Sequence, residues 1–251
     1  MEKLSGLLSS FSFKGTEVCG AKNTRFSESW SVKDVTDFCT SGDGKETING
    51  RAERTIEVTG NLKYNNAVIE GNSGLMNLAF DSANVIPTDM TFEETATELN
   101  STDGGTTGKG TETVAGFKER KSSITYYMKD TEDEPVRAST KAATLTFATS
   151  VNVAGNLRFD NLDIEDPNDG MIKVSLNGTW QGAPTQTNMG LPAGDTGAIA
   201  MTYKPGGTTA KAITGTGILL SKSVTLNFDG EMTFTYRFKF NGAILTPKYT
   251  S

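Results

Sequence analysis

The feature that most constrains this chain is a hairpin pattern that occurs twice, with a shift of 60 positions. The first copy spans residues 155–183 and the second spans residues 215–243. The same glycines and turn residues recur: Gly155 and Gly215, Asp169-Gly170 and Asp229-Gly230, Gly182-Ala183 and Gly242-Ala243. A repeat at a fixed spacing indicates that a chain reuses one structural unit.

Both copies alternate apolar and polar residues. The apolar positions are Ile172, Val174, Leu176 and Trp180 in the first copy, and Met232, Phe234, Tyr236, Phe238 and Phe240 in the second. Alternation with a period of two predicts an antiparallel strand with one face in the core and one in water. The Asp-Gly pair favours a tight hairpin turn. Trp30 and Trp180 both lie in phase with apolar neighbours, so the pattern predicts both in the sheet core.

The rest of the chain also indicates a mainly β, antiparallel fold, a sandwich or barrel. We expect a strand pair within 11–38 and single strands at 54–64, 88–95, 121–129, 143–148 and 198–203. One helix is expected at about 73–83, capped by Ser73, because Leu75, Leu78 and Ala79 follow helical spacing. A flexible polar loop is expected at about 97–118.

Composition narrows the classes of function. The chain has 251 residues, a net charge of -6 and no histidine. An acidic protein lacks the cationic surface that binds nucleic acid through its phosphates. The absence of histidine removes the commonest general base and the commonest metal ligand. No apolar run is long enough to span a membrane, and the N-terminus lacks the pattern of a signal peptide, so we expect a chain made and retained in a cytoplasm.

Carboxylate clusters are the remaining candidates for chemistry. Residues 163–170 crowd four carboxylates, as calcium sites do, but the second copy of the hairpin has only Asp229 there. An acidic solvated turn is therefore the better interpretation. Glu93 and Glu94 could form a glycosidase pair only at a defined separation, which the sequence does not set. We assign no catalytic, cofactor-binding or metal-binding residue, and we expect a protein that is not an enzyme.

Two cysteines, Cys19 and Cys39, leave one alternative open. Free thiols are the default in a reducing cytoplasm. A disulfide within or between subunits, formed after release from the cell, is the alternative. Their spacing resembles no zinc site.

The stretch from Phe13 to Val18, the strand with Trp30 and the stretch from Leu157 to Ile164 follow one another in an order that resembles the phage major tail tube protein family over about residues 11–183. The cues are the stretch from Phe13 to Val18, the strand with Trp30, Asp34-Val35-Thr36, the glycine-rich loop to Glu46 and Asn49-Gly50, and the strand from Thr55 to Gly60. The expected helix and the strand after Pro87 follow in order. The stretch from Leu157 to Ile164, the corner Asn168-Asp169-Gly170 and the stretch from Val174 to Gly178 resemble that family's closing hairpin.

The resemblance implies a subunit of rings, usually six-fold, that stack into a hollow tube. The inner sheet would line a channel for DNA and the tape-measure protein, with tail terminator and baseplate proteins as further partners and the virion tail as location. The long loop, here about 36–53, would contact the next ring. Its candidate contact residues are Asp37, Cys39, Asp43, Lys45 and Glu46.

The chain continues beyond the point where a simple tube subunit would end. We therefore expect a tail-tube-like domain at 1–183 and an additional β unit at 184–251. Either the tube domain is partly duplicated, which would allow rings of fewer chains, or a second module decorates the outside. The alternative function is a carbohydrate-binding or adhesive β-sandwich on a virion surface.

Overall fold

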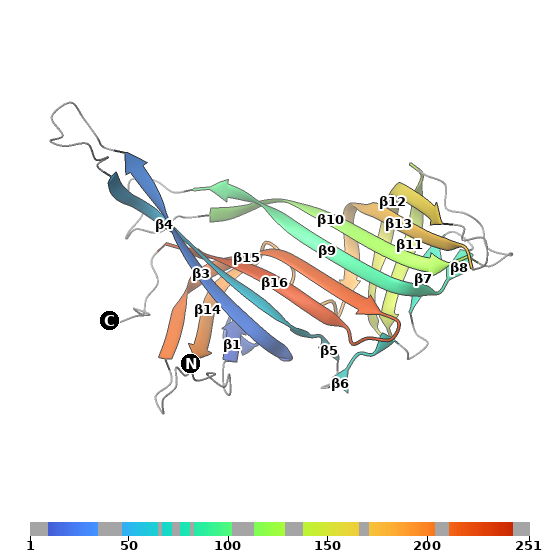
Figure 1. Ribbon diagram of the computed structural model, residues 1–251, viewed down its shortest axis with the longest axis horizontal. Helices are drawn as coiled ribbons and strands as arrows, with labels where there is room; N and C mark the ends of the chain where they lie inside the picture. Colours follow the sequence, from blue (N-terminus) through green and yellow to red (C-terminus); the bar gives the residue numbers. More distant parts are fainter. Residues whose placement is uncertain are drawn as a thin grey trace.

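The computed structural model describes residues 10–34, 47–64, 67–71, 76–80, 83–101, 113–128, 138–165, 171–203 and 211–242. In these ranges the chain is almost entirely β-strand and the strand pairs are antiparallel, as the sequence predicts (Figure 1). No described segment is an α-helix, so this part of the chain holds no helix able to cross a membrane.

Sixteen strands make up the described structure. The first ten are β1 (Ser10–Phe13), β2 (Thr16–Glu17), β3 (Ala21–Asp34), β4 (Thr47–Asn61), β5 (Lys63–Tyr64), β6 (Ala67–Val68), β7 (Asn77–Phe80), β8 (Ala83–Val85), β9 (Pro87–Asn100) and β10 (Thr113–Tyr127). The other six are β11 (Thr140–Ala148), β12 (Val151–Glu165), β13 (Lys173–Thr187), β14 (Thr196–Tyr203), β15 (Lys211–Asn227) and β16 (Thr233–Asn241).

Most strands fall into two sets with the same order. The first set, called here the framing module, comprises β1–β4 and β14–β16 in the order β2-β1-β14-β15-β16-β4-β3. The second set, the inserted module, comprises β7–β13 in the order β8-β7-β11-β12-β13-β10-β9. In sequence, the inserted module lies between β4 and β14 of the framing module.

The two modules share the register of their pairs as well as their strand order. Every cross-strand pair of β15–β16 has a counterpart 60 positions earlier in β12–β13. Each hairpin carries a bulge at the same place, Leu220 in one and Asp160 in the other. Gly242 and Gly182, at φ 69° and 72°, adopt the same left-handed conformation just after the matching strand segments. The repeat seen in the sequence is therefore a repeat of backbone geometry.

The N-terminal halves of the modules are also equivalent, although the hairpin repeat in the sequence does not extend to them. Every pair of β3–β4 recurs 66 positions later in β9–β10, with both register shifts preserved. The short strands β1–β2 and β7–β8 match in the same way at a shift of 67. The chain thus contains two complete copies of one seven-strand arrangement.

The long strands β15 and β12 turn a corner within each module. The first part of β15 pairs with β14, and the part after the Leu220 bulge pairs with β9 instead. A bulge bends a strand and increases its twist, so one strand can belong to two layers. Buried apolar side chains from both modules form one continuous core, and the strand order has open ends, so the sheet is not a closed barrel.

Three expectations need correction. The expected helix at about 73–83 is wrong for residues 76–80 and 83, because β7 starts at Asn77, β8 starts at Ala83, and Leu78 and Phe80 are core positions of a strand. Residues 72–75 and 81–82 lie outside the described ranges. The expected loop at 97–118 is too wide, since β9 runs to Asn100 and β10 starts at Thr113. Trp180 is buried as expected, but Trp30 is 40% exposed on the edge strand β3.

The strands at 196–241 do not form a sheet of their own. β14 pairs with β1, β15 with β9, and β16 with β4, so strands from the expected C-terminal unit lie among strands of the expected N-terminal domain. Together, β3-β4-β16-β15-β9-β10-β13-β12 form an uninterrupted run of eight strands, four from each module.

Candidate assembly site

The two modules meet where β9 of the inserted module pairs with β15 of the framing module. Seven residues on each strand are in register, from Ser221 opposite Thr95 to Asn227 opposite Asp89. Val224 and Phe92 are opposite each other in the core, and the hydroxyls of Thr91 and Thr225 lie 3.1 Å apart on the other face. This joint is an edge-to-edge contact of the kind that normally forms between separate sheets or chains.

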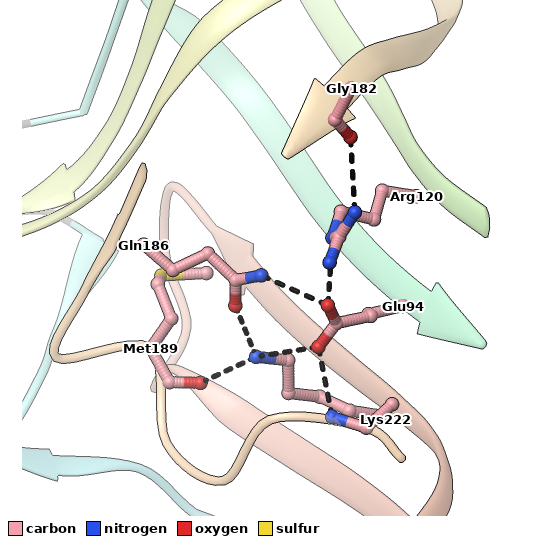
Figure 2. A network of polar contacts seen from close by, with 7 residues as sticks. Glu94, Arg120, Gly182, Gln186, Met189 and Lys222 are labelled. Atoms are coloured by element: carbon pink, nitrogen blue, oxygen red, sulfur yellow. Dashed lines mark hydrogen bonds and ion pairs between the residues drawn. The ribbon is translucent and has the colours of Figure 1, made fainter. Parts of the chain in front are cut away.

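A buried polar network stabilises this joint (Figure 2). Glu94 on β9 accepts hydrogen bonds from Arg120 Nε at 2.7 Å, Gln186 Nε2 at 3.2 Å and the backbone N–H of Ala193 at 2.9 Å. Lys222 on β15 places its Nζ 3.7 Å from the Glu94 carboxylate. The carboxylate therefore holds strands of both modules together with the segment that links them.

Lys222 is the contribution of the framing module to this network. Its ammonium group donates to Gln186 Oε1 at 2.5 Å and to the carbonyl of Met189 at 3.4 Å, and it lies 5.3 Å from the centre of the Phe92 ring. The Lys222 side chain is fully buried. A buried ammonium group persists only when acceptors replace its lost water, and these contacts supply them.

Burial and charge act in opposite directions on the two partners. Burial raises the pKa of Glu94, but the Ala193 N–H and the charges of Lys222 and Arg120 outweigh it and hold the pKa below its usual value. Burial lowers the pKa of Lys222 to about 8, and the Glu94 charge offsets only part of that effect. The joint therefore contains a firmly ionised carboxylate and a lysine whose charge is costly to bury.

The framing module carries the same Arg–Glu arrangement at its own edge. Arg54 donates through Nε to Glu28 at 2.7 Å and through Nη1 to the Gly242 carbonyl at 3.3 Å. In the inserted module, Arg120 donates to Glu94 and to the Gly182 carbonyl at 3.0 Å. The difference is that β3 pairs only with β4 among the described strands, so nothing equivalent to Lys222 lies across from Glu28; at the position of β12 equivalent to Lys222 the chain has Leu162.

The segment between β13 and β14 is fitted closely against the joint. Gly190 has φ 75°, and a Cβ atom there would lie 1.9 Å from the hydroxyl oxygen of Tyr236. That hydroxyl accepts the backbone N–H of Leu191 at 3.2 Å, and burial raises the pKa of Tyr236 to about 12. The link between the modules is thus anchored to the framing module's core.

The eight-strand run has one unpaired edge at each end within the described residues. β3 pairs only with β4, and residues 161–165 of β12 pair only with β13. The side chains on the wet face of the run are mainly Ser, Thr and Asn, with charges opposed across strands. Arg25 lies beside Glu57, Glu57 beside Arg237, and Glu93 beside Lys121.

All five residues proposed from sequence as the inter-ring contact lie outside the described ranges. These are Asp37, Cys39, Asp43, Lys45 and Glu46. Cys19 is described and has an exposed, free thiol, whereas Cys39, its partner in the proposed disulfide, lies outside the described ranges. Glu93 and Glu94 face opposite sides of β9, so they do not form a carboxylate pair. Among the described residues, no cluster of three or more potential metal ligands occurs.

Sequence reasoning missed the residues of the joint, although a signal for them exists. Phe26-x-Glu28 and Phe92-x-Glu94 are 66 positions apart, and so are Glu53-Arg54 and Glu119-Arg120. Four matching positions at one shift identify the second repeat and its Arg–Glu pairs. Lys222 has no such signal, because Leu162 stands at the equivalent position.

No protein-family model and no curated protein matches this chain.

Proposed function

We propose that this chain is the structural subunit of a phage tail tube, which assembles into stacked rings whose channel conducts DNA. The observation that carries the proposal is the eight-strand run built from two equivalent four-strand units joined edge to edge. Adding further copies extends this run by repeating one type of contact. A protein of this design builds a continuous wall of strands, and it needs no catalytic group.

The number of chains per ring follows from the two modules. The family resemblance implies rings of usually six tube units, and each chain here supplies two equivalent units. We therefore expect three chains per ring, with an approximate six-fold appearance and a true three-fold symmetry. A heterologous contact between identical chains closes into a ring when its rotation allows closure.

The wet face of the eight-strand run suits a channel wall. Its short hydroxyl and amide side chains present no basic stripe, and Arg25, Arg237 and Lys121 each lie beside an acidic residue. DNA binds proteins mainly through cations that neutralise its phosphates. A wall with balanced or acidic charge would let DNA pass without holding it, and the net charge of -6 agrees with this.

The two hairpins β3–β4 and β9–β10 are candidates for the contact between rings. In Figure 1 both extend toward the same side of the molecule, at the left of the view. The family resemblance assigns the inter-ring contact to the loop after β3, and the equivalent position in the inserted module is the loop after β9. The proposed partners are copies of the chain, the tape-measure protein, and the tail terminator and baseplate proteins, in a virion tail assembled in the host cytoplasm.

Electron microscopy of the purified protein tests the function. We expect rings or tubes in negative stain, three-fold class averages, and a trimer mass by native mass spectrometry. Assembled tubes should not retard double-stranded DNA at low salt. A protein that stays monomeric at all concentrations and binds a glycan would refute the proposal and favour the adhesive β-sandwich.

A further inference from the structure

The unpaired edges at the two ends of the eight-strand run are counterparts of the two strands that join inside the chain. β3 is the counterpart of β9, at a shift of 66, and residues 161–165 of β12 are the counterparts of 221–225 of β15, at a shift of 60. Each chain therefore contains one completed joint and the two halves of a second one. The completed joint gives the geometry from which the second can be derived.

We propose that β3 of one copy pairs antiparallel with β12 of a second copy, in the register of the internal joint. In the internal joint Val224 lies opposite Phe92. Their counterparts are Ile164, 60 positions earlier, and Phe26, 66 positions earlier, so the same register sets Ile164 opposite Phe26. It also sets Asp163 opposite Ser27 and Glu165 opposite Arg25. The proposal names the partner and the register of the assembly proposed above, and in that respect it rests on the proposed function.

The side chains at these edges are complementary in this register. Ile164 is 41% exposed and Phe26 is partly exposed, whereas Val224 and Phe92 are fully buried in the internal joint. Pairing would cover both apolar side chains. Glu165 and Arg25 are exposed and of opposite charge, and Asp163 would face the hydroxyl of Ser27. Opposite charges and apolar pairs directly across two strands both stabilise a sheet.

The partner is a second copy, because β3 and β12 lie at opposite ends of the run and are not paired with each other within the chain. Seven strand-to-strand steps separate them, or about 34 Å measured along the sheet at the usual strand spacing. Each copy offers one edge of each kind, so the contact is head-to-tail and repeats. The Glu28–Arg54 pair is already formed on β3 and faces Leu162, so this contact does not require a second buried lysine.

A disulfide trap tests the register. In a background with Cys19→Ser and Cys39→Ser, the pair S27C and D163C places two thiols directly opposite each other across the proposed joint. Directly opposed residues in antiparallel strands have the Cα separation that a disulfide needs. The matched control pairs S27C with N161C, which is displaced by two residues, or about 7 Å along the strand.

We expect oxidation to link S27C/D163C into covalent oligomers on non-reducing gels, with at least tenfold less cross-linking in the control pair and in each single variant. Equal cross-linking of the two pairs would overturn the register. Tubes that form normally while S27C/D163C stays uncross-linked would overturn this inference and leave the proposed function standing. Cross-linked rings or chains that never stack into tubes would support the joint and refute the tail tube.

A second set of variants does not depend on disulfide formation. I164D should raise the protein concentration needed for assembly at least tenfold, because it places a carboxylate opposite Phe26. I86D is the matched control. Ile86 is 56% exposed, comparable to Ile164, but it lies on neither edge strand, so I86D should leave assembly unchanged. R25A and E165A should each impair assembly, and the double variant R25A/E165A should impair it by less than the two single effects combined. Fully additive effects, with all variants folded by circular dichroism, would refute the Glu165–Arg25 pairing.

Discussion

Replacing Glu94 by glutamine tests whether the buried carboxylate holds the two modules together. Glu94 is 1% exposed in its side chain, and it faces Arg120 at 2.7 Å and the fully buried Lys222 at 3.7 Å. The substitution removes the anion and leaves two buried cations close together. Breaking a buried ion pair by removing one partner costs roughly 3–5 kcal/mol. We expect a loss of that size in the free energy of unfolding.

The framing module supplies the matched control. Glu28 makes the same 2.7 Å contact with Arg54, but its side chain is 19% exposed and β3 pairs only with β4 among the described strands, so no counterpart of Lys222 lies across from it. A glutamine at position 28 keeps an acceptor for Arg54 and the site is closer to water, so we expect a smaller loss than for E94Q, about 1–2 kcal/mol. The two variants thus differ in environment while the chemical change is the same.

Urea denaturation followed by tryptophan fluorescence, at pH 7 and one protein concentration, measures both variants. The double variant E94Q/K222M should recover part of the loss, because it removes the stranded ammonium group; the double-mutant cycle then gives the coupling energy. Equal losses for E94Q and E28Q, or no recovery in the double variant, would show that the Lys222–Glu94 contact does not stabilise the joint.

Three further predictions concern pH, the tryptophans and the linking segment. The pKa of Lys222 is about 8 in the folded protein against 10.5 in the unfolded chain, so the unfolded chain binds more protons between these values. Stability should therefore rise between pH 8 and pH 9, where Tyr236 is still almost fully protonated in both states, and K222M should lose that rise in urea titrations at the two pH values. Trp180 donates to Ser122 Oγ at 2.8 Å in the core, whereas Trp30 is 40% exposed. W180F should cost about 1–3 kcal/mol and W30F less than about 0.5 kcal/mol, and iodide should quench mainly Trp30; equal quenching of both would contradict the burial. G190A should destabilise the protein by at least about 2 kcal/mol more than G182A in thermal unfolding. Both glycines have positive φ, but only a Cβ at position 190 would clash with the Tyr236 hydroxyl. Similar losses for the two variants would argue against the close approach of Tyr236 to Gly190.

The sequence predicted the β class and the closing hairpins well, because their information is local. Alternation of Phe234, Tyr236 and Phe238 fixes which face of a strand is buried, and Asp229-Gly230 marks its turn. The expected helix at 73–83 was wrong for residues 76–80. Leu75, Leu78 and Ala79 follow helical spacing in the sequence, but β7 is a strand of only four residues that buries Leu78 and Phe80. Short apolar runs do not distinguish the two periods.

The joint between the modules could not be predicted in the same way. It pairs β9 with β15, more than a hundred residues apart, and its buried charges sit at positions where alternation alone predicts apolar side chains. In the sequence, Glu94 is one of three glutamates near the end of an expected strand, and Lys222 lies between two serines like an ordinary surface lysine. Their role depends on which edges meet, and that depends on the equivalence of the two modules.

The insertion of one module inside the other has a consequence for the order of events during synthesis. The β3–β4 hairpin leaves the ribosome early, but its partner β16 is among the last segments made. The inserted module has all its own partners between β7 and β13, so it can fold while the framing module is still incomplete. A half-made chain would then offer a finished β12 edge but no supported β3 edge. The head-to-tail contact proposed above needs both edges, so any such assembly would have to wait for the completed polypeptide.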